Sequence, residues 1–509
     1  MNTASRFAIA TSFAFISACS VIPLTGTSTS TGQPEKSGST GMVLPATTAD
    51  DDARTHYMTG WTDYENSRFI SANKKFRAAA DSDPSFAMAH LMAAASSNST
   101  EGFVTSLELA TSNKDGTSRG EQLLIETFEH FLANNATGAI ATSQQLAMLH
   151  PASPRAWVFL GGAHSNVNDA DSARAAYKKA IEVDAAHVPG HIGLGNSFLT
   201  QEPKDFAMAE EHFKHAVALT PDEPNPYDLL GDAHRAQGNL QAAYADYTKA
   251  AELAPNLGSG LQQRGHVNSF LGNYAEARAD YARAAELEDA RGSNAGPSFR
   301  TFGAYVNLHQ GNRAAAITEL LAIAGGLEGS TMEGADDLRI GALQNVALIA
   351  IEDFKTDVAR DAIASATAIA LRQADALGSD DVRRNANATR AYWEGMLAAR
   401  TYDAAGADSK ANEYERLVAS STNPRKLERM HEILGMSAYR KGDFAGAVEH
   451  LDSGNHVNNM YTKYYLARAN ESAGNSAEAA RLYDEMAVYN FNGPGYAMFR
   501  KDILARASN

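Results

Sequence analysis

Residues 157–184 read WVFLGGAHSNVNDADSARAAYKKAIEVD, and the spacing of small and aromatic residues in this stretch decides the fold. Gly161 is followed by Ala173, Tyr177 and Ala180, at offsets of 12, 16 and 19 residues. Three more sets have the same offsets, and they are Gly60 with Ala72, Phe76 and Ala79, Gly231 with Ala243, Tyr247 and Ala250, and Gly265 with Ala277, Tyr281 and Ala284. A period of about 34 residues, typical of repeat proteins, is therefore superimposed on the helical period.

The physical reason for this spacing is the close packing of two helices. A small residue in a first helix and small residues in a second helix let the helices approach, and the aromatic ring fills the remaining gap. Pro84 and Pro255 follow their glycines by 24 residues and end the second helix, because proline lacks a backbone donor and clashes with a continuing turn. A chain of 509 residues is too long for one compact core, so we predict an all-α array of helical hairpins.

This pattern resembles the tetratricopeptide repeat. The resemblance implies a right-handed α-solenoid of tetratricopeptide-type helical hairpins, which binds proteins or peptides in a concave groove lined by the first helices and has no catalytic activity. Several units depart from the pattern: the partners of Gly195 arrive two residues late, Gly435 is followed by Leu451 in the aromatic position, and the unit of Gly303 lacks the aromatic residue. We interpret these units as degenerate repeats.

The composition changes along the chain and predicts its division into segments. Residues 20–49 are rich in Ser, Thr, Gly and Pro and cannot bury enough apolar surface to fold. The predicted segments are a signal peptide (1–18), a flexible tether (19–50), a repeat array (51–324) with irregular helical units at 101–150, an irregular helical segment (325–400), and C-terminal degenerate repeats with a capping helix (401–509).

The N-terminal residues predict export and a lipid anchor. Arg6 precedes an apolar run at residues 7–16, which is too short to span a bilayer and is typical of a signal peptide. The run ends in Ile16-Ser17-Ala18-Cys19, which resembles the bacterial lipobox, where the signal is cut before a cysteine that then receives lipid. Cys19 is the only cysteine, so disulfides are excluded. Ser20 follows it, which by the same resemblance favours the outer membrane over the inner membrane.

The charge and the histidines argue against several other classes of function. A net charge of −16 and the lack of a basic stripe disfavour nucleic acid as a partner. Two histidine pairs have helical spacing, His187 with His191 and His212 with His215, but no cysteine or acidic cluster completes a set of metal ligands. We therefore predict no metal, no cofactor and no catalytic residues.

Candidate groove residues follow from the resemblance, which places exposed side chains one and four residues after the signature glycine. Three consecutive units then give Asn196, Leu199, Asp232, Arg235, His266 and Ser269 as the candidate partner-binding groove. Stacking of the units predicts a polar ladder of Asn196, Asp232 and His266, suited to peptide groups, although a solvated inner surface would show the same residues. The basic clamp that some family members use for acidic C-terminal peptides is disfavoured, because Val158 and Gly162 occupy its positions.

The sequence thus favours a lipid-anchored adaptor or scaffold in the bacterial cell envelope that engages a protein or peptide ligand and contacts the membrane through Cys19. One alternative is an oligosaccharide-binding outer-membrane lipoprotein, which is disfavoured because only Trp61, Trp157 and Trp393 are available as tryptophan platforms. A second alternative is a hydrolase with an active site in residues 325–400. The oligomeric state and the identity of the partner stay open.

Overall fold

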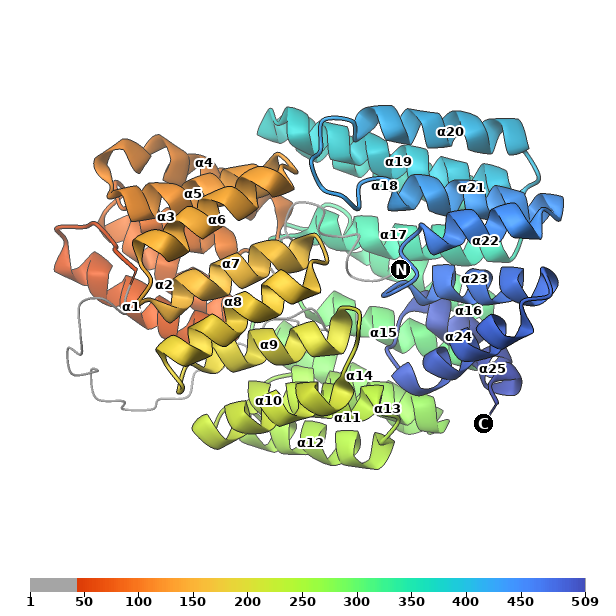
Figure 1. Ribbon diagram of the computed structural model, residues 1–509, viewed down its shortest axis with the longest axis horizontal. Coiled ribbons are helices and arrows are strands. Elements are labelled where there is room, and N and C mark those ends of the chain that lie inside the picture. The colour runs from red at the N-terminus through yellow and green to blue at the C-terminus, as the bar shows by residue number, and fades with distance from the viewer. Residues whose placement is uncertain (1–43, 509) are drawn as a thin grey trace. The chain divides into compact units, whose positions relative to one another are not determined.

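The computed structural model describes residues 44–508, and this part of the chain is entirely helical (Figure 1). The predicted signal peptide, the lipid attachment site Cys19 and most of the predicted tether lie outside the described residues. Helices α1 to α24 pair in chain order into hairpins, and α25 follows the last hairpin. The all-helical repeat architecture predicted from the spacing is confirmed.

The first helices of the hairpins are α1 (Asp51–Glu65), α3 (Ala87–Ala95), α5 (Arg119–Leu132), α7 (Pro154–Asn166), α9 (Val188–Thr200), α11 (Pro224–Ala236), α13 (Ser259–Leu271), α15 (Gly296–His309), α17 (Ala335–Glu352), α19 (Asp380–Arg400), α21 (Glu428–Lys441) and α23 (Met460–Ser472). The second helices are α2 (Phe69–Ser82), α4 (Thr100–Ser112), α6 (Ala136–Leu149), α8 (Ala170–Val183), α10 (Phe206–Leu219), α12 (Leu240–Leu253), α14 (Tyr274–Ala290), α16 (Arg313–Gly326), α18 (Thr356–Leu377), α20 (Ala404–Leu417), α22 (Phe444–Asp452) and α24 (Ser476–Tyr489). The last helix is α25 (Pro494–Arg506), and a short 3-10 helix, η2, spans Lys114–Gly116.

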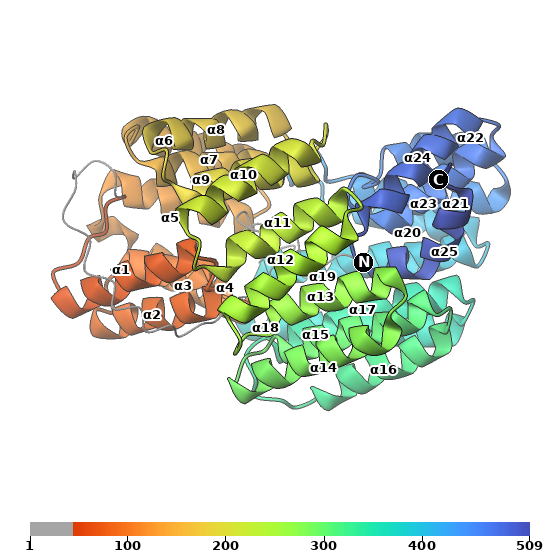
Figure 2. The same cartoon turned by 90° about the horizontal axis from the view of Figure 1, so that it is seen from below.

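The described residues form two compact units. The N-terminal unit contains residues 44–234 and 242–260, and the C-terminal unit contains residues 235–241 and 261–508. Within each unit, successive hairpins lie side by side, as the two views in Figures 1 and 2 show. The predicted irregular segment, 325–400, lies wholly inside the C-terminal unit.

The signature spacing produces the expected contacts between paired helices. A Cβ atom added to Gly161 would lie 2.6 Å from the ring of Tyr177, and one added to Gly231 would lie 2.5 Å from the ring of Tyr247. Both rings are buried, and the signature alanine Ala173 is 0% exposed. Only a residue without a side chain leaves room for the aromatic ring at this separation of the helices.

Side-chain caps start many of the second helices. Asp169, Asp403 and Asp443 each accept a hydrogen bond from a backbone N–H in the first turn of the helix that follows. These bonds satisfy donors that have no partner inside the helix, so the hairpin turns have defined ends. A proline starts α7 instead: the fixed φ of Pro154 suits the first helical position.

The segment 325–400 is irregular in a definable way. Helices α17, α18 and α19 have 18, 22 and 21 residues, whereas α7, α8, α11 and α12 have 13 or 14. The turn between α17 and α18 and the turn after α19 each place a bulky residue in the left-handed region, Phe354 at φ 55° and Tyr402 at φ 63°. Longer helices and these turns replace the signature spacing here.

The last residues of the predicted tether pack against the helices. Leu44 is buried, the hydroxyl of Thr47 donates to Glu121 at 2.7 Å, and the hydroxyl of Thr48 donates to Asp83 at 2.6 Å. Glu121 also closes the capping box at the start of α5 with Ser118. Residues 44–50 therefore pack against the helices and are not part of the tether that was predicted to extend to residue 50.

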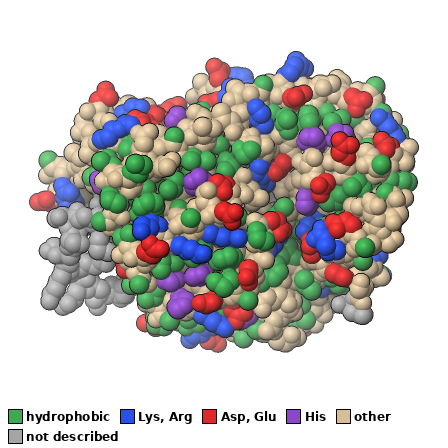
Figure 3. Space-filling view, in the orientation of Figure 1, with side chains coloured by type: hydrophobic (Ala, Val, Ile, Leu, Met, Phe, Trp, Pro, Cys, Tyr) green, Lys and Arg blue, Asp and Glu red, His purple; other side chains and the backbone are tan. Residues whose placement is uncertain are grey.

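Two further properties of the described residues concern membrane-spanning helices and the distribution of charged side chains. None of their helices combines the length and the apolar character that crossing a bilayer requires. On the face shown in Figure 3, Lys and Arg side chains lie interspersed with Asp and Glu.

We predict opposite effects when alanine replaces glycine at two helical positions. Gly161→Ala should lower the free energy of unfolding by about 1–3 kcal/mol, because its methyl group overlaps the buried Tyr177 ring. Gly325→Ala in α16 should instead raise it by up to about 1 kcal/mol, since nothing lies within 4 Å of the new methyl group and alanine favours the helix. Urea unfolding followed by circular dichroism measures both, and effects of the same sign would contradict the proposed packing.

Candidate functional site

The six residues predicted to face an open groove are all buried. Their exposed fractions are 4% for Asn196, 0% for Leu199, Asp232 and Arg235, and 1% for His266 and Ser269. The prediction that these positions are exposed on an inner surface is therefore wrong.

Two of these residues are turned toward the signature tyrosine of their own hairpin. The hydroxyl of Tyr247 donates to the carboxylate of Asp232 at 2.7 Å, and the hydroxyl of Tyr281 lies 2.6 Å from Nδ1 of His266. A buried tyrosine hydroxyl requires a hydrogen-bond partner, and the residue after the glycine is in reach to provide it. This internal demand explains why Asp232 and His266 do not point to solvent.

The remaining predicted residues also have internal contacts. Ser269 donates to the carbonyl oxygen of Gly265 at 2.9 Å. The guanidinium of Arg235 lies 4.2 Å from the centre of the Phe491 ring and donates to Gln263 at 3.3 Å. Part of the predicted groove is thus covered by a segment near the C-terminus.

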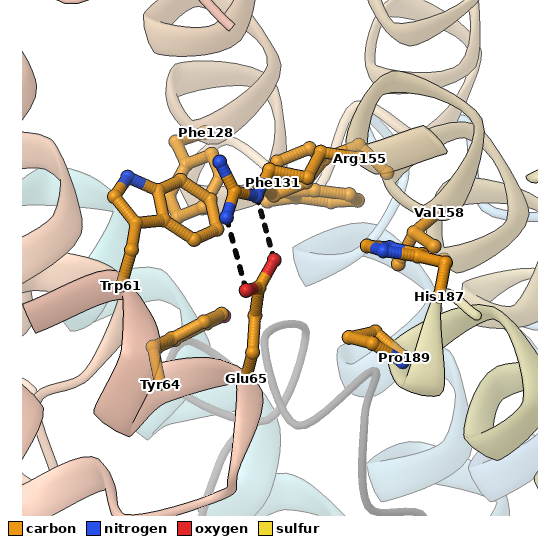
Figure 4. Close-up of a pocket in the computed structure, with 11 residues that line it drawn as sticks. Trp61, Tyr64, Glu65, Phe128, Phe131, Arg155, Val158, His187 and Pro189 are labelled. Atoms are coloured by element: carbon orange, nitrogen blue, oxygen red, sulfur yellow. Dashed lines mark hydrogen bonds and ion pairs between the residues drawn. The ribbon is translucent and has the colours of Figure 1, made fainter. Parts of the chain in front are cut away.

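The structure instead contains a pocket in the N-terminal unit (Figure 4). It has a volume of about 520 Å³, counting space open to solvent, and first helices supply its walls. We call it the aromatic pocket, and its lining residues are Trp61, Tyr64 and Glu65 of α1, Phe128 and Phe131 of α5, Arg155, Val158, Phe159 and Gly162 of α7, and His187 and Pro189 at the start of α9.

The aromatic residues of the pocket form a connected wall. Trp61 makes edge-to-face contacts with Tyr64 at 5.6 Å and with Phe159 at 6.4 Å between ring centres. Phe159 in turn lies 6.3 Å from Phe128, which lies 6.2 Å from Phe131. Edge-to-face pairs of this kind hold their rings in fixed orientations, so the wall is formed before any ligand arrives.

An ion pair lies in the middle of the apolar wall. Nε of Arg155 donates to one oxygen of Glu65 at 2.6 Å, and a terminal nitrogen donates to the other oxygen at 3.0 Å. The guanidinium also lies 4.6 Å from the centre of the Trp61 ring. The two side chains are 17% and 22% exposed, so this bidentate pair is largely shielded from water.

His187 points into the pocket from the side opposite Trp61 (Figure 4). Its Nε2 atom is buried and has no hydrogen-bond partner. Burial lowers the pKa of His187 to about 4, and nearby Arg155 acts in the same direction while Glu65 opposes it. The ring is therefore neutral at pH 7 and presents one unsatisfied polar atom to whatever occupies the pocket.

Helical spacing explains why these side chains converge. Arg155, Val158, Phe159 and Gly162 stand at positions i, i+3, i+4 and i+7, so they share one face of α7. The residues of α1 and α5 follow the same rule, with three on one face of α1 and two on one face of α5. Small residues at Val158 and Gly162 leave the space that the rings surround.

Sequence reasoning missed this pocket, although its own rule contained the signal. The offsets of one and four residues, applied to Gly60, select Trp61 and Tyr64, and both line the pocket. Trp157 lies outside the pocket lining, donates to the carbonyl oxygen of Pro151 at 3.0 Å and packs on the buried cluster that contains Tyr177.

Two observations concern metal binding and the segment 325–400. Within residues 44–508, no group of three or more His, Cys, Asp or Glu side chains could hold a metal ion. In the segment 325–400, the buried carboxylate of Glu352 accepts hydrogen bonds from Tyr461 at 2.6 Å and from Arg400 at 3.2 Å. These bonds give Glu352 a clear role in packing α17 against its neighbours.

The ion pair generates a stability prediction. Arg155→Met should lower the free energy of unfolding by about 2 kcal/mol, because it leaves the Glu65 carboxylate in aromatic surroundings without a partner. Adding Glu65→Met should recover most of that loss. A double-mutant cycle by urea unfolding measures the coupling, and additive effects of the two changes would show that the pair does not act as a unit.

Family comparisons match several of the hairpins. One tetratricopeptide repeat model matches residues 154–187, 225–257 and 259–291, and a second matches residues 434–497. Tetratricopeptide repeat protein 37 of Xenopus laevis is 35% identical over 81 residues. That match covers 16% of this chain and only 4% of the relative.

Solved structures with a similar local fold include MamA from Desulfovibrio magneticus RS-1, at 20% identity and a TM-score of 0.29, over 34% of this chain and 97% of that one. They also include YrrB, described as a TPR protein with an unusual peptide-binding site, at 18% identity and a TM-score of 0.26, over 38% and 95% of the two chains. The signature contacts and the matched models lead to one conclusion: the chain contains tetratricopeptide repeats, at residues 154–187, 225–257, 259–291 and 434–497.

Proposed function

We propose that this tetratricopeptide repeat protein is an adaptor whose N-terminal unit captures an apolar segment of a partner protein in the aromatic pocket. The observation that carries the proposal is the convergence of four first helices on one preformed aromatic wall. Tetratricopeptide repeats are protein-interaction modules, and such modules use their first helices for binding. We propose that the aromatic pocket is the place where the first helices of this chain bind a partner.

The chemistry of the pocket favours a protein side chain as the occupant. Large apolar or aromatic side chains gain most from burial against aromatic walls such as this one. Glu65 and Arg155 satisfy each other, and Nε2 of His187 is the polar atom without a partner. One hydrogen bond to neutral His187 would fix the orientation of an otherwise apolar ligand.

An oligosaccharide fits the pocket less well, although the aromatic wall is larger than the number of tryptophans indicated. Each sugar ring carries several hydroxyl groups that need hydrogen-bond partners once they are buried. The ion pair inside the wall would have to open to provide them. Protein binding is therefore the function that the site supports best.

Filling the pocket should weaken binding without unfolding the chain. Peptides selected by phage display against the purified chain should contain an aromatic or large aliphatic anchor, and Val158→Phe should weaken their binding at least tenfold, about 1.4 kcal/mol. Met148→Phe, at a side chain that is 70% exposed, is the matched control and should leave binding unchanged. Fluorescence anisotropy with the selected peptides gives both affinities.

The outcome also separates the alternatives. Selected peptides that bind the Val158→Phe variant as well as the wild type would refute the pocket as the protein-binding site. Binding on a glycan array that Val158→Phe abolishes would show that the same pocket takes oligosaccharides, and the adaptor proposal would then fail.

We further propose that the protein is an exported lipoprotein that Cys19 anchors, on the outer membrane in preference to the inner membrane. Support comes from the sequence alone: the apolar run at residues 7–16, the lipobox-like Ile16-Ser17-Ala18-Cys19 and the Ser/Thr/Gly/Pro-rich stretch that follows. Several acyl chains on one cysteine would hold a protein to a bilayer without a spanning helix.

Cys19→Ala should move the protein from the membrane pellet to the soluble fraction and abolish the incorporation of labelled palmitate. Cys19→Ser is the isosteric control and should behave in the same way, since a serine is not lipidated. A Cys19→Ala variant that stays in the membrane fraction would contradict the lipid anchor.

A further inference from the structure

A segment near the C-terminus lies on the surface where the repeat resemblance places a ligand. Residues 490–493 connect α24 to α25, and the side chains of Phe491 and Asn492 contact residues of α11, α13, α14 and α15 in the C-terminal unit. Arg235 and His266, which they contact, stand four residues and one residue after signature glycines. The connecting segment thus occupies two of the predicted groove positions.

The carboxamide of Asn492 makes three hydrogen bonds with this surface. Its nitrogen donates to Nδ1 of His266 at 3.0 Å and to the hydroxyl of Tyr281 at 3.2 Å, and its oxygen accepts from Nε2 of His309 at 3.0 Å. Donors and acceptors on three different helices therefore recognise both ends of one amide group. An ordinary helix connection does not require such a set.

The residue before the asparagine has an equally specific partner. The ring of Phe491 lies 4.2 Å below the guanidinium of Arg235, which is 0% exposed, and 4.3 Å from the ring of Tyr489. An aromatic ring against a desolvated guanidinium gains from both burial and the cation–π attraction. We call Arg235, His266, Tyr281 and His309 the carboxamide clamp.

The clamp is polar and buried, so it needs an occupant. Burial lowers the pKa of His266 well below its ordinary value and the pKa of His309 to about 4, so both rings are neutral at pH 7. Removing Asn492 would leave Nε2 of His309 without its hydrogen-bond acceptor, whereas Nδ1 of His266 would keep the Tyr281 hydroxyl. A cap that served only to cover the end of the array would be expected to bury apolar side chains there.

We propose that the carboxamide clamp is a second peptide-binding site, which recognises an aromatic residue followed by asparagine in a partner protein and which the chain's own Phe491–Asn492 occupies in the unbound state. The partner segment replaces the connecting segment at the clamp, while α25 keeps its contacts with α15 and α23. The aromatic pocket is not involved, so a failure of this proposal would not affect the proposed function, and the reverse also holds.

The intramolecular segment sets the sign of the expected effect. A tethered ligand competes at a millimolar effective concentration, so the wild-type chain should bind an added peptide weakly. Weakening the internal segment should therefore increase binding in trans. A purely structural role for Phe491 and Asn492 predicts no such gain.

The test uses a fluorescein-labelled synthetic peptide VYNFNGPGY, which copies residues 488–496, and the purified full-length chain. The double variant Phe491→Ala/Asn492→Ala should bind the peptide at least tenfold more tightly than the wild type in fluorescence anisotropy. A control peptide, VYNAAGPGY, should not bind to either protein. Adding His309→Leu to the double variant should remove the gain.

The isosteric variant Asn492→Asp keeps the test decisive if the double variant does not fold. A carboxylate cannot donate to His266 and Tyr281, so this variant should also bind the peptide more tightly than the wild type and should show faster hydrogen exchange at residues 488–496. Equal affinities of wild type and Asn492→Asp for the peptide, or equal binding of the control peptide, would overturn the proposal.

Discussion

The contact between a glycine of one helix and an aromatic ring of the next is the constraint on which the rest of the structure depends. The ring of Tyr177 lies against Gly161 of its own hairpin and also against Gly193 of the following one, where an added Cβ would lie 2.6 Å and 2.5 Å from it. One side chain therefore sets the spacing within a hairpin and between neighbouring hairpins. Because the ring fills the space completely, the helices cannot shift without losing close packing.

This constraint also decides which inner residues are available for binding. Where the signature ring is a tyrosine, its buried hydroxyl needs a partner, and Asp232 and His266 serve this purpose in their hairpins. Phe76 has no hydroxyl that needs a hydrogen-bond partner. In its hairpin the residue after the signature glycine is Trp61, which lines the aromatic pocket. In the hairpins of Tyr247 and Tyr281, the tyrosine hydroxyl thus fixes the orientation of the residue after the glycine.

The fold could be predicted from the sequence because the signature contacts are local, with partners 12 to 19 residues apart. The groove could not, because its coverage depends on distant segments: Asn492 bonds to His266, which stands 226 residues earlier in the chain. The same limit applies at the other end, where Thr47 bonds to Glu121 across 74 residues and shortens the predicted tether. The aromatic pocket was within reach of the sequence, since the offset rule at Gly60 leads to Trp61 and Tyr64.

The central claim is that a protein segment occupies the aromatic pocket, and photo-crosslinking inside living cells tests it most directly. A photoreactive p-benzoylphenylalanine would replace Phe159 in the pocket or, as a control, Leu321, which is 42% exposed and outside it. The account predicts one discrete protein adduct from position 159 that disappears when Val158→Phe is added, and none from position 321. The absence of an adduct at position 159, or the same adduct at both positions, would contradict it.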